Sequence, residues 1–230
     1  MPGKGNIAID GPAGAGKSTV AKLVAEKLGY IYIDTGAMYR AITWKALVNK
    51  ISVEDEIRMA RLAQNTVIDF YVDIQTKKQL IFCDGQDVTE EIRSPEVSKL
   101  VSHVAKIPGV RLVLLKQQQL LATKNNVVMD GRDIGSNVLP NAPFKFFLTA
   151  SVEERARRRF LELSNKGYKI SQADVVTEII ERDKIDQERS VAPLVKTSDA
   201  IEIDTSFLKP VEVVNKIISI INRISESKTN

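Results

Sequence analysis

The chain has 230 residues, of which 43% are hydrophobic and 27% charged, a composition typical of a globular protein with a full core. The net charge of +4 is too small to favour nucleic acid as a partner. The single cysteine, Cys83, excludes an internal disulfide framework, and the single histidine, His103, excludes a histidine-rich metal site. No stretch reaches about 18 apolar residues and no signal-peptide pattern opens the chain, so we expect a cytoplasmic protein that does not enter a membrane.

Short apolar runs alternate with segments of helical periodicity along most of the chain. Segments such as STVAKLVAEKL and SVEERARRRFLEL carry apolar residues at helical spacing. This alternation predicts a parallel five-stranded sheet flanked by helices, with ligands bound at the carboxyl ends of the strands. The runs that we predict as strands are Asn6–Asp10, Tyr30–Asp34, Asn126–Asp130, Phe144–Ala150 and Ala200–Asp204.

The region between the second and third of these strands breaks the alternation. TVIDFYVDI, KQLIFCDG and QDV follow one another within residues 66–88, and they have the pattern of short antiparallel strands with polar turns. We therefore predict an inserted small antiparallel-β/α subdomain at about residues 65–104. Near the C-terminus, Val211–Ile224 is apolar at i, i+3, i+4 and i+7, which indicates a helix docked on the core.

A glycine-rich segment joins the first strand to the first helix. Its glycines let backbone N–H groups converge at the helix N-terminus, where the helix dipole favours an anion. Lys17 can reach β and γ phosphates, and the Ser18 hydroxyl can ligate Mg²⁺. This is the P-loop pattern G-x-x-x-x-G-K-[ST], and it predicts nucleotide binding without choosing among a kinase, a motor ATPase and a GTPase; no guanine-recognising Asn-Lys-x-Asp fits the last of these. The matching residues are Gly11, Pro12, Ala13, Gly14, Ala15, Gly16, Lys17 and Ser18, followed by Thr19.

Arginines gather at the predicted strand ends and in the helices beyond them. A guanidinium pairs bidentately with phosphate oxygens, which suits a doubly charged acceptor phosphate and the charge of a phosphoryl-transfer transition state. The alternative for Arg157–Arg159 is a solvated basic helix face. The positions are Arg40 and Arg132 after the second and third strands, Arg155, Arg157, Arg158 and Arg159 after the fourth, and Arg182 and Arg189, which share a predicted helix face with Asp186.

Four motifs together resemble the bacterial cytidylate kinases, a group of nucleoside monophosphate kinases: GPAGAGKST, DTGAMYR, DGRDIG and ERDKIDQERSVAPL. The resemblance extends from Ile7 to about Leu208, and the last three motifs are much more specific than the first. It implies a P-loop NTPase core at about residues 1–36, 105–150 and 166–230. It also implies a monophosphate-binding region at about residues 37–104, which contains the antiparallel insert, and a short helical lid at about residues 151–165.

The resemblance further implies roles for single residues. Asp133 would accept a hydrogen bond from N4 of cytosine, which is an amino donor. Ser102 and Arg111, on either side of an expected turn at Pro108–Gly109, would face the same base. The remaining implied roles are acceptor-phosphate binding by Thr35, Arg40, Arg132 and Arg189, ribose binding by Arg182 and Asp186, ATP binding by Gly11–Thr19 with Arg155, Arg157 and Arg158, metal binding by Ser18, and catalysis by Lys17, Arg132 and Arg189. Which lid arginine touches ATP stays open.

The implied reaction is direct phosphoryl transfer from ATP to CMP, and to dCMP, with Mg²⁺ as cofactor. We expect a monomer that acts on small molecules and binds neither nucleic acid nor membranes. Two alternatives stay open: a P-loop kinase for another monophosphate or a small metabolite, and a nucleotide-dependent RNA-binding or switch protein, which only the basic charge supports.

Overall fold

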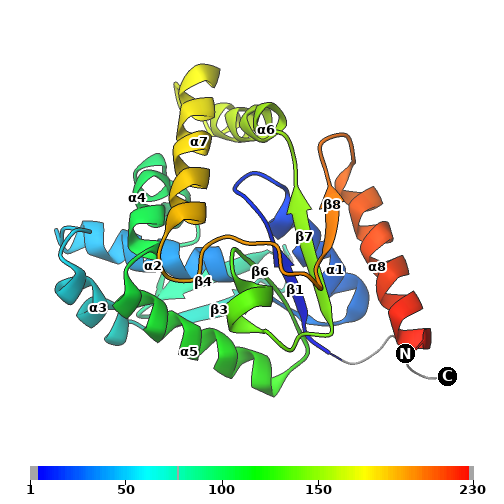
Figure 1. The fold of residues 1–230 in the computed structure, drawn as a ribbon. Helices are drawn as coiled ribbons and strands as arrows, with labels where there is room; N and C mark the ends of the chain where they lie inside the picture. The colour runs from blue at the N-terminus through cyan, green and yellow to red at the C-terminus, as the bar shows by residue number, and fades with distance from the viewer. Residues whose placement is uncertain (1–4, 77, 228–230) are drawn as a thin grey trace. The chain divides into compact units, whose positions relative to one another are not determined.

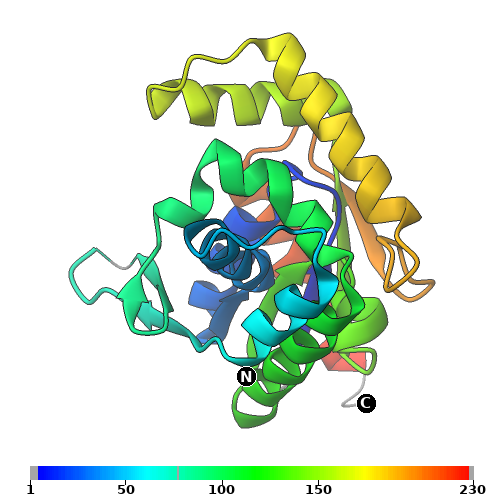
Figure 2. The same ribbon diagram turned by 90° about the vertical axis from the view of Figure 1, so that its left-hand side faces the viewer.

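The computed structural model describes residues 5–76 and 78–227. The chain divides into two compact units, the first made of Met1–Ile33 with Leu121–Asn230 and the second of Asp34–Leu120. The ribbon is drawn in two orientations in Figures 1 and 2. Each unit has its own sheet and its own apolar core.

A five-stranded parallel sheet in the order β2-β6-β1-β7-β8 lies at the centre of the first unit (Figure 1). The central strands are almost fully buried, which explains their continuous apolar runs. All five predicted strands and the parallel sheet are confirmed, with ends that differ by one residue at most. The strands are β1 (Ile7–Asp10), β2 (Ile31–Asp34), β6 (Val127–Gly131), β7 (Phe144–Thr149) and β8 (Ile201–Asp204).

Helices α1 (Lys17–Leu28) and α8 (Pro210–Ser227) pack against each other and against the sheet. The buried face of α8 consists of Val213, Val214, Ile217 and Ile221, which recur at helical spacing. They join the β1 and β7 side chains in one apolar cluster. The predicted C-terminal helix docked on the core is therefore confirmed.

Helices α6 (Val152–Asn165) and α7 (Gln172–Glu188) are joined by a short loop and cross each other obliquely, as Figure 2 shows. Ala156 and Leu163 of α6 pack on Val175 and Ile179 of α7. A capping box between Ser171 and Asp174 begins α7. Helix α6 spans the segment expected to be a lid, and its role as a lid stays a prediction.

The second unit holds an antiparallel three-stranded sheet in the order β3-β4-β5, which confirms the predicted insert. Its strands are β3 (Ile68–Val72), β4 (Gln79–Cys83) and β5 (Gln86–Asp87). Its helices are α2 (Thr35–Val48), α3 (Glu56–Gln64), α4 (Pro95–Ala105) and α5 (Pro108–Lys124), with a 3₁₀ turn at Glu91–Arg93. The expected turn at Pro108–Gly109 is wrong, because these residues begin α5, where proline is tolerated since the first helical N–H has no intrahelical partner.

Within residues 5–76 and 78–227, we find no helix with the length and apolar character needed to cross a bilayer.

Gly11, which follows β1, is required by a close approach of two strands. Its φ is 144°, a region that side chains rarely adopt, and a Cβ at this position would overlap the Leu148 carbonyl of β7. Gly29, which ends α1, also has a positive φ of 67°, but a Cβ there would meet nothing within 4 Å. A comparison of these two positions therefore distinguishes the effect of backbone strain from that of steric overlap.

We expect Gly11→Ala to lower the free energy of unfolding by more than about 2 kcal/mol, because strain and overlap add. Gly29→Ala should cost only about 1–2 kcal/mol, the ordinary cost of a side chain in the left-handed region. Urea unfolding of both variants gives the comparison. Equal losses would show that the approach of β1 to β7 does not restrict this position.

Candidate active site

The P-loop wraps around its own lysine. Gly14 and Gly16 have φ angles of 76° and 83°, so the backbone turns back on itself before α1 begins at Lys17. The buried Lys17 side chain returns over the loop, and its Nζ donates a hydrogen bond to the Pro12 carbonyl at 2.7 Å. The first N–H groups of α1 and the ammonium of Lys17 thus occupy the same end of the helix, which is the arrangement of an anion site.

Positive charge is crowded beside this loop. Burial lowers the pKa of Lys17 well below its ordinary value, and the nearby charge of Arg132 lowers it further. Burial also lowers the pKa of Arg182 to about 10, and Arg132 again adds to the effect. Cations that destabilise one another in a buried site favour an anionic ligand, because such a ligand would relieve the repulsion.

Two oxygens beside the loop fit a magnesium ion. The Ser18 hydroxyl donates to Oδ2 of Asp130 at 2.8 Å, and the Tyr32 hydroxyl donates to Oδ1 of the same carboxylate at 2.9 Å. The described residues contain no group of three or more His, Cys, Asp and Glu side chains able to hold a metal. A single carboxylate with a hydroxyl suits Mg²⁺, which keeps several waters and takes phosphate oxygens as its other ligands.

The DGRD segment at the end of β6 and the end of α7 form a network of ion pairs. Arg132 Nε donates to Asp186 Oδ2 at 2.8 Å, and Arg189 Nη2 donates to Asp133 Oδ1 at 3.3 Å. Burial opposes both charges of the first pair, yet the pair raises the pKa of Arg132 and lowers that of Asp186. The structure therefore brings together the predicted residues Arg132, Asp133, Arg182, Asp186 and Arg189, although Arg189 caps α7 and is not inside the helix.

Arg182 differs from Arg132 and Arg189 in that its Nε forms no hydrogen bond within the described residues. That atom is buried and has no partner among the described residues. Its neighbour Asp183 uses one carboxylate oxygen to pair with Arg155 Nη1 at 2.7 Å, while the other, Oδ1, is buried without a partner. Buried polar atoms without partners are costly, so this end of α7 has capacity for a polar ligand.

The three arginines predicted to touch ATP have different surroundings. Arg155 is buried, and its guanidinium donates to the Ala13 carbonyl of the P-loop at 3.1 Å. Arg158 pairs with Glu154 and donates to Thr205, and its Nη1 lies 3.7 Å from where a Cβ of Gly16 would stand. Arg157 is exposed and pairs with Glu154, whose pKa falls to about 2 mainly through that hydrogen bond.

Four predicted acceptor-site residues lie in the second unit. Asp34 caps α2 through the Ala37 N–H, which buries Thr35 in the first turn. Arg40 Nη1 donates to Ser98 Oγ at 2.9 Å. The Ser102 hydroxyl on α4 is buried and has no hydrogen-bond partner among the described residues. Arg111 on α5 is buried, donates to the Ala105 carbonyl at 3.0 Å and lies over the ring of Tyr39.

Comparison with known proteins agrees with this constellation. Residues 7–223 match the family described as Cytidylate kinase. A cytidylate kinase of Bacillus cereus is 54% identical over 95% of this chain and 96% of the relative, and one of Bacillus anthracis is 55% identical over 94% and 95%. The chain belongs to the cytidylate kinase family.

The fold of this family member also matches a solved structure of low sequence similarity. An uncharacterized protein from Eubacterium ventriosum aligns with 96% of this chain and 99% of its own, with a TM-score of 0.51 at 13% identity. At this identity the likeness concerns the fold alone, and it agrees with the P-loop core described above.

Two acidic residues of this cytidylate kinase family member were missed by our sequence analysis. Asp130, the partner of Ser18, ends the predicted third strand, and Asp10 ends the first. Their position at the carboxyl ends of parallel strands was the available signal. An aspartate at a strand end is also a common helix or turn cap, so the sequence did not separate these two from Asp204, which is exposed and bonded to Ser206.

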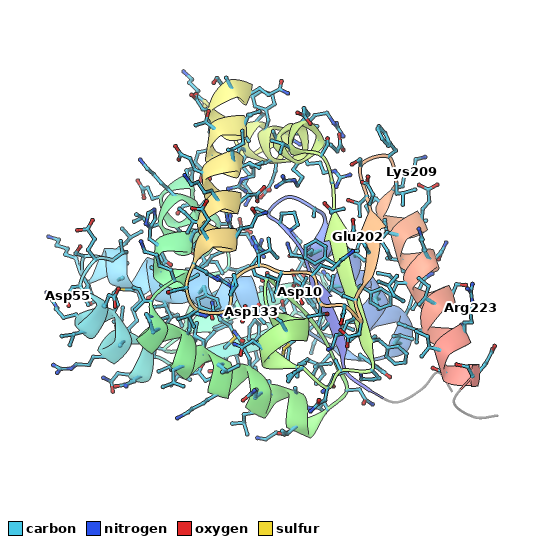
Figure 3. The ribbon with its side chains drawn as sticks, in the orientation of Figure 1. Asp10, Asp55, Asp133, Glu202, Lys209 and Arg223 are labelled. Carbon is cyan, nitrogen blue, oxygen red and sulfur yellow. The ribbon has the colours of Figure 1, made fainter. Side chains whose placement is uncertain are left out.

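Asp10 is almost completely buried beside the P-loop. Burial raises its pKa to about 6 and the charge of Asp133 contributes, whereas hydrogen bonds from the Gly135 and Ile134 N–H groups and the charge of Lys17 oppose the shift. Figure 3 labels Asp10 and Asp133, which lie near one another in the first unit. The folded state therefore binds a proton at Asp10 more tightly than the unfolded chain does.

This shift predicts a pH dependence of stability. The contribution of Asp10 to the free energy of unfolding is fully present below the ordinary pKa of 3.8 and is lost as the pH rises through about 6. Relative to Asp10→Asn, the parent should lose on the order of 2–3 kcal/mol between about pH 4 and pH 7. Urea unfolding of both proteins across this range provides the measurement. A difference that stays constant with pH would contradict the raised pKa.

Proposed function

We propose that the chain transfers the terminal phosphoryl group of ATP to CMP, and to dCMP, forming ADP and the nucleoside diphosphate. The observation that carries this proposal is the cluster of buried Lys17 and half-buried Arg132 and Arg182 beside a P-loop, in a chain of the cytidylate kinase family. Two phosphorylated substrates with a total of several negative charges are the ligands that such a cluster suits. We also propose that the protein works as a monomer in the cytoplasm on free nucleotides.

The ATP phosphates would bind to the P-loop N–H groups from Gly11 to Thr19, with Lys17 at the β and γ phosphates. Among the lid arginines, Arg158 has the strongest support for a phosphate contact, because its guanidinium lies next to Gly16. Arg157 is exposed and held by Glu154, so it would need to leave that pair to reach ATP. The cations position the two phosphates and neutralise charge as the acceptor oxygen attacks in line.

The acceptor monophosphate would be held by two sets of residues. In the first unit, Arg132 and Arg189 would bind its phosphate, Arg182 and Asp186 its ribose, and Asp133 the N4 amino group of cytosine. Asp133 accepts from Arg189 and Asn137. In the second unit, Thr35 and Arg40 are proposed for the phosphate, and Ser102 and Arg111 for the base.

Mg²⁺ is the proposed cofactor, with Ser18 and Asp130 as the residues that would hold it. When bound, the ion would neutralise charge on the ATP phosphates. Tyr32 would keep the Asp130 carboxylate oriented through the hydrogen bond to its Oδ1.

A panel of acceptors tests the proposed reaction directly. With ATP and Mg²⁺, we expect ADP release with CMP to exceed that with UMP, AMP and shikimate. Faster turnover of another acceptor would favour the rival small-acceptor kinase. Absence of kinase activity together with salt-sensitive RNA binding would favour the RNA-binding alternative.

Lys17→Ala should lower kcat by roughly 10²-fold or more, because it removes a preorganised cation from the transferring phosphoryl group. Lys22→Ala is the matched control, since Lys22 is an exposed lysine of the same helix. Steady-state kinetics with saturating CMP measure both variants. Normal turnover in Lys17→Ala would remove the P-loop from the reaction.

Asp133→Asn should lower kcat/KM for CMP and narrow the preference for CMP over UMP, which we expect to be about tenfold to a hundredfold in the parent. Uracil presents an acceptor where cytosine presents its amino group, so the carboxylate repels it and an amide does not. Glu181→Gln, which removes an exposed carboxylate from α7, is the control. An unchanged CMP-to-UMP ratio in Asp133→Asn would show that Asp133 does not contact the base.

A further inference from the structure

Asp10 immediately precedes the P-loop in sequence, but its side chain forms hydrogen bonds with a distant segment that follows β6. Its Oδ1 accepts from the Ile134 N–H at 2.8 Å, and its Oδ2 accepts from the Gly135 N–H at 2.7 Å. Both bonds are buried and span more than 120 residues of sequence, as the separations of 124 and 125 show. One carboxylate therefore joins the end of β1 to the segment that follows Asp133.

The two N–H groups belong to the first residues of a π-helical turn, Ile134–Val138. The first N–H groups of a helical segment have no partner within the segment, and a carboxylate satisfies two of them with charge-assisted hydrogen bonds. A carboxylate is the side chain that suits this task, because both of its oxygens accept. An asparagine would offer one acceptor and would turn an N–H donor toward a backbone N–H donor.

Gly135 permits this close approach. A methyl group at position 135 would lie 3.2 Å from Asp10 Oδ2 and 3.1 Å from Lys145 Cδ, closer than most side chains stand. Lys145 does not compete for the Asp10 carboxylate, because its ammonium pairs with Asp199 at 2.7 Å. The backbone at Gly135 thus lies close to both the Asp10 carboxylate and the aliphatic chain of Lys145.

The π-helical turn in turn holds Asp133. The Asp133 carbonyl accepts from the Asn137 and Val138 N–H groups at 2.9 and 3.1 Å. The Asp133 carboxylate accepts from Asn137 and Arg189. A displacement of the turn would therefore move the backbone of Asp133 and one of its carboxylate partners together.

We propose that Asp10 is a positioning residue of the acceptor-nucleotide site: its carboxylate fixes the turn at Ile134 and Gly135 and thereby sets the orientation of Asp133 toward the cytosine. The inference rests on the proposed function. Asp10 would thus act on the acceptor nucleotide, although it lies next to the ATP-binding loop in the sequence.

Kinetics of Asp10→Asn test this assignment. We expect KM for CMP to rise about tenfold and the CMP-to-UMP ratio of kcat/KM to fall, because Asp133 is no longer oriented. KM for ATP should change much less than KM for CMP, because Lys17 keeps the larger favourable charge of Asp130 beside it, whereas a general disturbance of the fold would raise both constants. Asp204→Asn is the matched control: it makes the same change at an exposed strand-end aspartate of β8.

A second variant breaks the same contact from its other side. Gly135→Ala leaves the carboxylate intact and lies far from the P-loop in sequence, and it should reproduce the rise in KM for CMP with KM for ATP unchanged. Amide hydrogen exchange in Asp10→Asn should be faster at Ile134 or at Gly135, whichever N–H faces the new amide nitrogen, and this reports the loss of that bond even if turnover is too weak to measure.

Two results would overturn the inference. One is a rise in KM for ATP with normal CMP constants in Asp10→Asn, which would assign Asp10 to the P-loop. The other is unchanged exchange at Ile134 and Gly135 together with unchanged kinetics. Failure of the proposed function is a separate result, because it would be seen in the parent protein as a lack of CMP phosphorylation.

Discussion

Mutual repulsion among one buried and two half-buried cations beside the P-loop shapes the whole first unit. Lys17, Arg132 and Arg182 each lose hydration, and Arg132 disfavours the charge of both others. Burying such groups is costly unless carboxylates or a ligand balance them. Asp186 balances Arg132 through a direct pair, and the charges of Asp130 and Asp10 favour the charged form of Lys17. The remaining excess of positive charge is the feature on which the proposed phosphate binding rests.

The parallel sheet meets this constraint by its geometry. The carboxyl ends of β1 and β6 lie side by side, since Asp10 is in register with Gly131 and Ile9 with Asp130. The P-loop, the carboxylate of Asp130 and the DGRD segment consequently lie at adjacent strand ends. Helix α7 then supplies Asp186 and Arg189 from much later in the chain. These groups follow the strands directly, so the sheet keeps them at a fixed spacing.

Close backbone approach is the second device of the site. Gly11 lets β1 lie against the Leu148 carbonyl, and Gly14 lies so near α6 that a Cβ would be 3.0 Å from the Arg155 Cβ. Gly135 allows the π-helical turn to reach Asp10. At each place the chain gives up a side chain so that a polar backbone group can be bonded or a helix can pack. These glycines therefore allow backbone contacts near the charged site as well as tight turns.

Local periodicity and contiguous motifs were enough to predict the strands, the inserted antiparallel sheet, the P-loop and the family. Which charges meet could be seen only in the folded chain. Arg155, Arg157 and Arg158 look alike in sequence, yet one is buried against Ala13, one is exposed and one lies beside Gly16. Likewise Asp10, Asp130 and Asp204 all lie at or next to strand ends. In the folded chain Asp10 binds the turn at Ile134, Asp130 binds Ser18, and Asp204 is exposed. The reason is physical: a side chain's charge state and partners are set by burial and by residues over a hundred positions away, as with the separation of 112 between Ser18 and Asp130.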